Sequence, residues 1–97
     1  MNGRVSQDDP SVGHVTLRYW ASARAAAGAE QEQIPVAGPV DLASLVARAS
    51  AGRDRLAEVL ATCSVLIGDL PVASADPATV TVAPGAVVEF LPPFAGG

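Results

Sequence analysis

The chain has 97 residues, enough for one domain with a single modest hydrophobic core. With 49% hydrophobic and 16% charged residues, its composition favours a folded globular protein over general disorder. The formal net charge is −4 and all six basic residues are scattered arginines, which argues against binding to nucleic acid or to an anionic membrane surface.

The first part of the chain predicts an extension followed by a strand. Residues 1–13 are polar and lack the charged-then-apolar pattern of a signal peptide, so we expect a flexible extension and a cytoplasmic protein. No apolar run approaches the length of a membrane span. Residues 15–20 alternate between apolar and polar, as in a half-buried strand. Trp20, at the end of this strand, is expected to pack against a neighbouring element.

A short helix and a second strand are predicted next. Ser22 is a candidate N-cap for a helical turn over residues 23–27, and Gly28 is a candidate end for that turn. Residues 30–36 predict a strand. Pro35 cannot donate a hydrogen bond to a neighbouring strand, so we expect this strand at the edge of a sheet.

The clearest amphipathic helix is predicted over residues 42–51. Asp41 is its candidate N-cap and Gly52 its candidate end. Its apolar residues recur at i, i+3, i+4 and i+7, so one stripe is expected to cover a sheet. These residues are Leu42, Leu45, Val46 and Ala49. Residues 54–60 repeat a weaker helical pattern.

The remainder of the chain predicts short strands and turns. Residues 64–67 predict a short buried strand, and a turn is expected at residues 68–69. Residues 79–82 alternate, and residues 84–85 turn the chain into a last strand over residues 86–91. Two strands, a helix and then several short strands indicate an α+β domain, although this order does not fix the topology.

Side chains that could perform chemistry are few. Cys63 is the only cysteine, which excludes an internal disulfide, and we interpret it as a buried, inert thiol. His14 is the only histidine and is expected on the surface. One cysteine and one histidine do not make a metal site, so we expect this chain to bind no metal.

The C-terminal sequence, residues 91–97, reads Leu-Pro-Pro-Phe-Ala-Gly-Gly. Proline favours an extended path, so Pro92 and Pro93 are expected to direct the tail away from the domain. Gly96 and Gly97 have no Cβ, so the terminal backbone could enter a narrow channel and present a bare α-carboxylate. The alternative is that this glycine pair is incidental.

The stretch from Phe90 to Gly97 resembles the ending of the MoaD/ThiS-like family of ubiquitin-like sulfur carriers, and most closely that of the small subunit of molybdopterin synthase (MoaD). Members of that family typically end in two hydrophobic residues, Pro-Pro, a hydrophobic residue, a small residue and Gly-Gly. Residues 19–28 resemble the first loop of the family, with Arg24 at the position of a recurring arginine. The resemblance covers roughly residues 15–97.

This resemblance implies a β-grasp, ubiquitin-like roll: a mixed sheet packed by one main helix, with the last strand at the centre of the sheet. The expected organisation is a flexible extension (1–13), the β-grasp domain (14–91) and an extended tail (92–97). The last strand would then hold the tail on the most rigid element of the domain.

The resemblance also implies a function without catalytic side chains. Gly97 would be adenylated and then converted to a thiocarboxylate, which donates sulfur to cyclic pyranopterin monophosphate, while Gly96 allows the tail to thread. The chain would bind no cofactor, because ATP and Mg²⁺ belong to the activating partner. The implied partners are an E1-like adenylating enzyme (MoeB-like), a sulfur donor protein and the large subunit of molybdopterin synthase (MoaE-like).

Several residues are expected to contact these partners. Phe94 would be a hydrophobic anchor near the channel mouth, whereas Phe90 either belongs to an apolar docking face or packs in the core. Glu89 and Asp69 are the nearest candidates for an acidic contact. The other expected contact residues are Leu91, Pro92, Pro93, Ala95 and Arg24.

Two other functions are compatible with the same sequence. One is a related sulfur carrier that serves thiamine, cysteine or tRNA thiolation. The other is a ubiquitin-like protein modifier, or a plain interaction domain with an incidental Gly-Gly ending.

Overall fold

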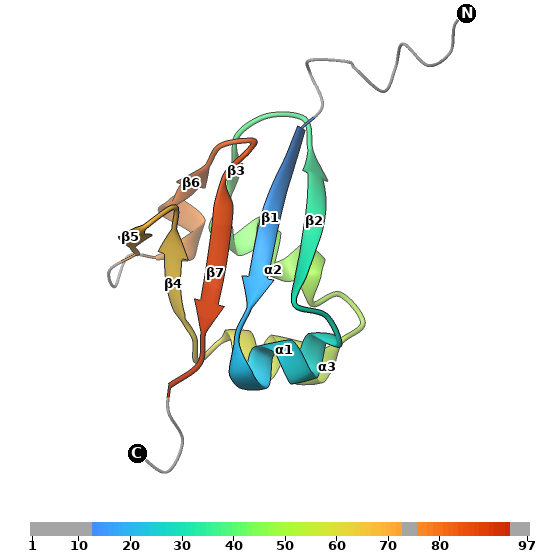
Figure 1. Cartoon of the computed structure of the whole chain (residues 1–97). Coiled ribbons are helices and arrows are strands. Elements are labelled where there is room, and N and C mark those ends of the chain that lie inside the picture. The colour runs from blue at the N-terminus through green and yellow to red at the C-terminus, as the bar shows by residue number, and fades with distance from the viewer. Residues whose placement is uncertain (1–12, 73–75, 94–97) are drawn as a thin grey trace, which may run out of the picture.

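This computed structural model describes residues 13–72 and 76–93. Within them, the helices pack against a five-stranded mixed sheet (Figure 1). The order of the strands is β2-β1-β7-β4-β5. β1 and β7 are parallel, and the other neighbouring pairs are antiparallel. The strands are β1 (Gly13–Tyr19), β2 (Gln31–Val36), β4 (Ser64–Ile67), β5 (Leu70–Pro71) and β7 (Val87–Leu91).

The last strand, β7, lies at the centre of this sheet, between β1 and β4. β2 lies at an edge of the sheet. This agrees with the expectation from Pro35, which cannot donate a hydrogen bond to a neighbouring strand. The expected α+β class and β-grasp, ubiquitin-like roll are therefore confirmed, including the central position of the last strand.

The second helix, α2 (Leu42–Ala49), begins as predicted, because the Asp41 carboxylate accepts a hydrogen bond from the Ser44 amide at 2.9 Å. It ends two residues earlier than predicted, at Ala49. The Ser50 hydroxyl donates to the carbonyl of Val46, and the guanidinium of Arg53 donates to the carbonyl of Ala49. The bond from Arg53 satisfies a carbonyl group in the last turn of the helix, and the Ser50 hydroxyl is a second donor to the Val46 carbonyl, which also accepts from the Ser50 amide.

The first helix, α1 (Ala21–Ala27), begins differently from the prediction. Ser22 lies inside the helix and is not its N-cap; the N-cap position belongs to Trp20, whose side chain makes no capping hydrogen bond. Ala21 has a φ of 50°, a left-handed conformation that side-chain-bearing residues rarely adopt. Gly28 ends the helix with a φ of 76°, as predicted.

A second, two-stranded sheet pairs β3 (Val40–Asp41) with β6 (Thr81–Val82). The predicted strand over residues 79–82 is shorter than expected, because Pro77–Thr79 form a turn of 3₁₀ helix, η2. The Asp76 carboxylate accepts the amide hydrogen bond that starts this turn. The third helix, α3 (Asp54–Leu60), has the residues predicted for it.

The core lies between one side of the five-stranded sheet, here called the inner face, and the helices. Tyr19 and Phe90 stack there with ring centroids 6.0 Å apart. Phe90 is completely buried, so of the two roles considered for it the structure supports core packing. The other fully buried hydrophobic residues include Val15, Leu17, Leu45, Leu56, Val82 and Val88.

Candidate functional site

The candidate site begins where β7 ends. Leu91 is the last residue of this strand and lies opposite Ser64 of β4. Pro92, which follows, is half-buried and Pro93 is exposed. The remaining tail residues, 94–97, lie outside the described residues, so the roles expected for them stay predictions. The base of the tail is thus held by a strand that is paired on both sides.

Arg24 lies on α1, at the same end of the sheet as the end of β7 (Figure 1). Its guanidinium is 3.3 Å from the carboxylate of Glu30, and about half of the arginine side chain is exposed. An ion pair this exposed adds little to the free energy of unfolding. Arg24 is therefore placed near the base of the tail and is accessible, while its contact with a partner stays a prediction.

The second part of the site is the sheet surface opposite the core, here called the outer face. Side chains along a strand alternate, so Glu89 points away from the side on which Val88 and Phe90 are buried. Across the sheet, Arg18 of β1 and Leu66 of β4 are the register neighbours of Glu89. In Figure 1 this face is turned toward the viewer, and α2 lies behind the sheet.

The outer face carries apolar surface close to the base of the tail. Trp20 is 41% exposed. Leu66, Val87 and Leu91 are half-buried on the same side. An exposed tryptophan with apolar neighbours beside a tail suits a protein-docking surface, since tryptophan is among the residues that contribute most to binding energies at interfaces.

Trp20 is held by a small cluster on this face. The sequence predicted that it packs against a neighbouring element; the structure shows its indole Nε1–H donating to Oε1 of Glu89 on β7, at 2.9 Å. The guanidinium carbon of Arg18 lies 5.5 Å from the centroid of the indole ring. Glu89, a candidate for an acidic partner contact, therefore already has a hydrogen-bond partner within the chain.

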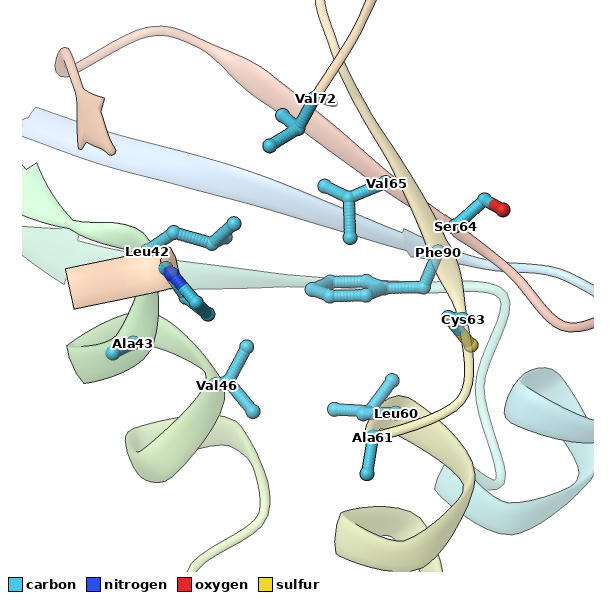
Figure 2. Close-up of a pocket in the computed structure, with 11 residues that line it drawn as sticks. Leu42, Ala43, Val46, Leu60, Ala61, Cys63, Ser64, Val65, Val72 and Phe90 are labelled. Carbon is cyan, nitrogen blue, oxygen red and sulfur yellow. The ribbon is translucent and has the colours of Figure 1, made fainter. Parts of the chain in front are cut away.

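An apolar cavity of about 550 Å³ lies on the other side of the sheet, between α2, α3 and β4 (Figure 2). In Figure 2 the ring of Phe90 extends toward Leu42 and Val46 of α2, with Leu60 of α3 below. Cys63 lies at the end of this cavity.

The Cys63 thiol suits the inert role predicted for it, although its burial is only partial. Its Sγ donates to the carbonyl of Val59 at 3.3 Å, and burial raises its pKa to about 11. A thiol with this pKa is protonated near neutral pH and is a weak nucleophile.

A polar cluster links β1 and β2 to the ends of the helices. The hydroxyl of Tyr19 donates to Glu32, and Arg53 donates to the same carboxylate oxygen at 3.0 Å. Burial, and then the bond to Glu32, raise the pKa of Tyr19, while the bond from Arg53 lowers the pKa of Glu32. Each side chain keeps its ordinary charge state and has a hydrogen-bond partner. The cluster therefore stabilises the fold, and its pKa shifts do not prepare a side chain for acid–base catalysis near neutral pH.

The described residues contain no group of three or more His, Cys, Asp or Glu side chains that could hold a metal ion. None of the helices in that part of the chain is long and apolar enough to cross a membrane.

No family model matches the sequence, and no curated protein is significantly similar to it. Solved structures do match. The Haloferax volcanii HVO 2177 protein is 25% identical with a TM-score of 0.73, and the match covers 93% of this chain and 92% of that protein. A chain from the complex of subunits 1 and 2 of molybdopterin-converting factor from Helicobacter pylori is also 25% identical, with a TM-score of 0.61 and coverage of 87% and 99%.

SAMP1 from Haloferax volcanii, a small archaeal modifier protein, is 18% identical with a TM-score of 0.72, and the match covers 88% of this chain and all of that one. The structural neighbours thus include small MoaD/ThiS-like ubiquitin-like proteins, among them a chain of a molybdopterin-converting factor complex and a small archaeal modifier protein. This chain has their fold, with matches that cover 87% and 88% of it.

Proposed function

We propose that this chain is a sulfur carrier whose C-terminal carboxylate becomes a thiocarboxylate. The observation that carries this proposal is that a tail reading Pro-Pro-Phe-Ala-Gly-Gly follows β7, the central strand of a β-grasp sheet. A central strand fixes the base of the tail, and glycines at its tip suit a narrow partner channel.

The chemistry requires activation, because a carboxylate is a poor electrophile. The Gly97 carboxylate attacks the α-phosphorus of ATP and releases pyrophosphate, which leaves an acyl adenylate. A sulfide sulfur then attacks the acyl carbon and releases AMP, which leaves the thiocarboxylate. If a persulfide attacks instead, the product is an acyl disulfide; a second thiol of the donor attacks its outer sulfur, the S–S bond breaks, and the donor leaves as a disulfide while the thiocarboxylate stays on Gly97. ATP, Mg²⁺ and the catalytic groups come from an E1-like (MoeB-like) partner and a sulfur donor protein.

Within this class, we propose the small subunit of a molybdopterin synthase, acting in the cytoplasm. The match to a chain of the Helicobacter pylori complex of subunits 1 and 2 supports a large-subunit (MoaE-like) partner. The thiocarboxylate would enter the active site of that partner and donate its sulfur to cyclic pyranopterin monophosphate.

Partner contacts in this proposal come from the tail and from the outer face beside it. Phe94 is the hydrophobic anchor, and Gly96 allows the tail to thread. Leu91 and Trp20 extend the contact onto the sheet, where both have exposed surface. Pro92, Pro93, Ala95 and Arg24 complete the proposed set. Phe90 is left out because it is buried in the core.

A protein modifier is the second candidate, favoured by the match to SAMP1 over all of that chain. The sequence contains no lysine. As a modifier, the chain would therefore attach to a target lysine without forming polymers through lysine side chains of its own.

Intact mass spectrometry tests the proposal. The purified protein is incubated with an E1-like enzyme, ATP and a sulfur donor, and we expect a mass increase equal to the replacement of one oxygen by sulfur, located at Gly97. The increase is absent without ATP. Matched variants are a deletion of Gly97, which removes the reacting residue, and Gly96→Val, which blocks threading; both are expected to fold and to lose sulfur transfer.

Two outcomes contradict the proposal. Normal sulfur transfer in the Gly97 deletion would show that Gly97 is not the reacting residue, and normal transfer in Gly96→Val would show that the tail does not thread a narrow channel. An adduct on target lysines, without a thiocarboxylate intermediate that delivers sulfur, would favour the modifier. Addition of the large subunit and the pyranopterin substrate separates the molybdopterin pathway from thiamine, cysteine and tRNA thiolation.

A further inference from the structure

The backbone of Trp20 is held at the junction of β1, β7 and α1. Its amide donates to the carbonyl of Phe90 on β7 at 3.2 Å, and its carbonyl accepts from the amide of Ala23 in the first turn of α1. Ala21, the next residue, has the unfavourable φ of 50°. A strained alanine persists only where surrounding contacts determine its conformation, so the direction of Trp20 is set by the fold.

The side chain of Trp20 is held as well. Glu89 accepts the hydrogen bond of the indole edge at 2.9 Å, and Arg18 lies over the face of the ring. Arg18 and Glu89 are themselves direct neighbours in the register of β1 and β7. A carboxylate acceptor makes this hydrogen bond stronger than a neutral one would be.

The cluster of Arg18, Trp20 and Glu89 lies beside the base of the tail, where it can take part in binding a partner. Glu89 lies two residues before Leu91, so the ring is fixed beside the point where the tail begins. The 41% exposure of Trp20 leaves part of the ring free to contact another protein. An aromatic side chain that is already ordered loses little conformational entropy on binding, which favours affinity.

We propose that Glu89 is a positioning residue: it orients Trp20 so that the indole forms a rigid apolar contact for the protein that receives the tail. The use of this contact by an activating enzyme or a large subunit rests on the proposed function. The partner surface facing Trp20 is apolar, and Glu89 acts through the indole and not as an acidic contact of its own.

The isolated chain provides the first test, because Trp20 is its only tryptophan. We expect Glu89→Ala to shift the indole N–H resonance in an NMR spectrum and to increase fluorescence quenching by acrylamide. Glu89→Gln is the matched control, since its amide oxygen can accept the same hydrogen bond, and it should stay closer to the wild type in both measurements. An unchanged resonance and unchanged quenching in Glu89→Ala would overturn the proposal.

The second test measures binding to the E1-like enzyme and to the large subunit. We expect Glu89→Ala to weaken binding about three- to tenfold, as for the loss of one hydrogen bond, and Glu89→Gln to weaken it less than about twofold. In a Trp20→Phe background, which has no indole N–H, Glu89→Ala should have no further effect. Equal losses for the two Glu89 variants, persisting in that background, would instead show a direct charge contact and overturn the proposal.

The two tests separate this inference from the proposed function. If the wild-type chain binds neither protein and acquires no sulfur, the proposed function fails. The resonance and quenching experiments on the isolated chain still decide whether Glu89 orients Trp20. Melting curves of each variant establish that it is folded before either comparison is made.

Discussion

The two faces of the central sheet differ in what they contribute, and β7 shows this within five residues. Val88 and Phe90 point to the inner face and are completely buried. Val87, Glu89 and Leu91 point to the outer face and are half-buried. Because side chains alternate along a strand, one segment can stabilise the domain with one set of residues and present a docking surface with the other.

Substitutions one position apart on β7 should therefore have different consequences. Inner-face substitutions create cavities and lower the free energy of unfolding. Outer-face substitutions leave the core intact and should act mainly on binding.

Phe90→Ala should reduce the free energy of unfolding by about 3–5 kcal/mol, because it removes a fully buried ring that stacks on Tyr19. The control is Glu89→Ala, the adjacent residue on the outer face, with an expected loss of about 1 kcal/mol or less. Urea unfolding followed by circular dichroism measures both.

A comparable loss in the two variants would contradict the division between the faces. If Phe90→Ala fails to fold, Val88→Ala offers a smaller inner-face truncation at a fully buried position. Its loss should still exceed that of Glu89→Ala.

Arg53→Ala should have an intermediate effect, about 1–3 kcal/mol, because it leaves several polar groups without partners. Its guanidinium donates to Glu32, to the carbonyl of Ala49 at 3.0 Å and to that of Ala27 at 2.6 Å, and so joins the ends of α1 and α2 to β2. Arg53→Lys is the control. It keeps the charge but cannot reach three acceptors in one plane, so we expect it to recover only part of the loss.

Thermal melts of both variants measure this effect. Full recovery by lysine would show that charge alone accounts for the role of Arg53. If Arg53→Ala reduced the melting temperature as little as Glu89→Ala, the hydrogen bonds of Arg53 would not contribute to the stability of the domain.

Local patterns were sufficient to predict most of the fold. Alternation identified β1, and helical spacing together with Asp41 identified the start of α2, because both signals depend on residues a few positions apart. The tail motif likewise lies within one short segment. The central place of the last strand came from the family resemblance, since the pattern of elements alone leaves the topology open.

Contacts between distant residues could not be predicted. Trp20 and Glu89 are 69 positions apart, and nothing near either residue indicates their hydrogen bond. The φ of Ala21 was also unpredictable, because an alanine-rich segment favours a right-handed helix and only the surrounding fold imposes this turn. β3 has two residues, too few for a periodic pattern.

The smallest predicted effect concerns pH. The hydrogen bond from Arg53 lowers the pKa of Glu32 below its ordinary value of 4.5, so this carboxylate stabilises the fold when it is ionised. That contribution is complete above the pKa of the unfolded chain and is lost as the pH falls through the lower pKa of the folded state. Glu32→Gln should therefore be less stable than the wild type by about 1 kcal/mol near pH 7, with the difference shrinking as the pH falls below the ordinary glutamate pKa of 4.5.

Urea unfolding at several pH values measures this difference, and the same substitution in an Arg53→Ala background is its control. Without the guanidinium, the main cause of the lowered pKa is gone, so the effect of Glu32→Gln on the free energy of unfolding should vary less with pH in that background. An effect that is equally pH-dependent in both backgrounds would show that the Tyr19 hydroxyl, and not Arg53, controls the ionisation of Glu32. The cluster of Tyr19, Glu32 and Arg53 would then depend mainly on Tyr19, whose ring is buried in the core. Its contribution to the free energy of unfolding would belong to the inner face of the sheet and not to the outer face.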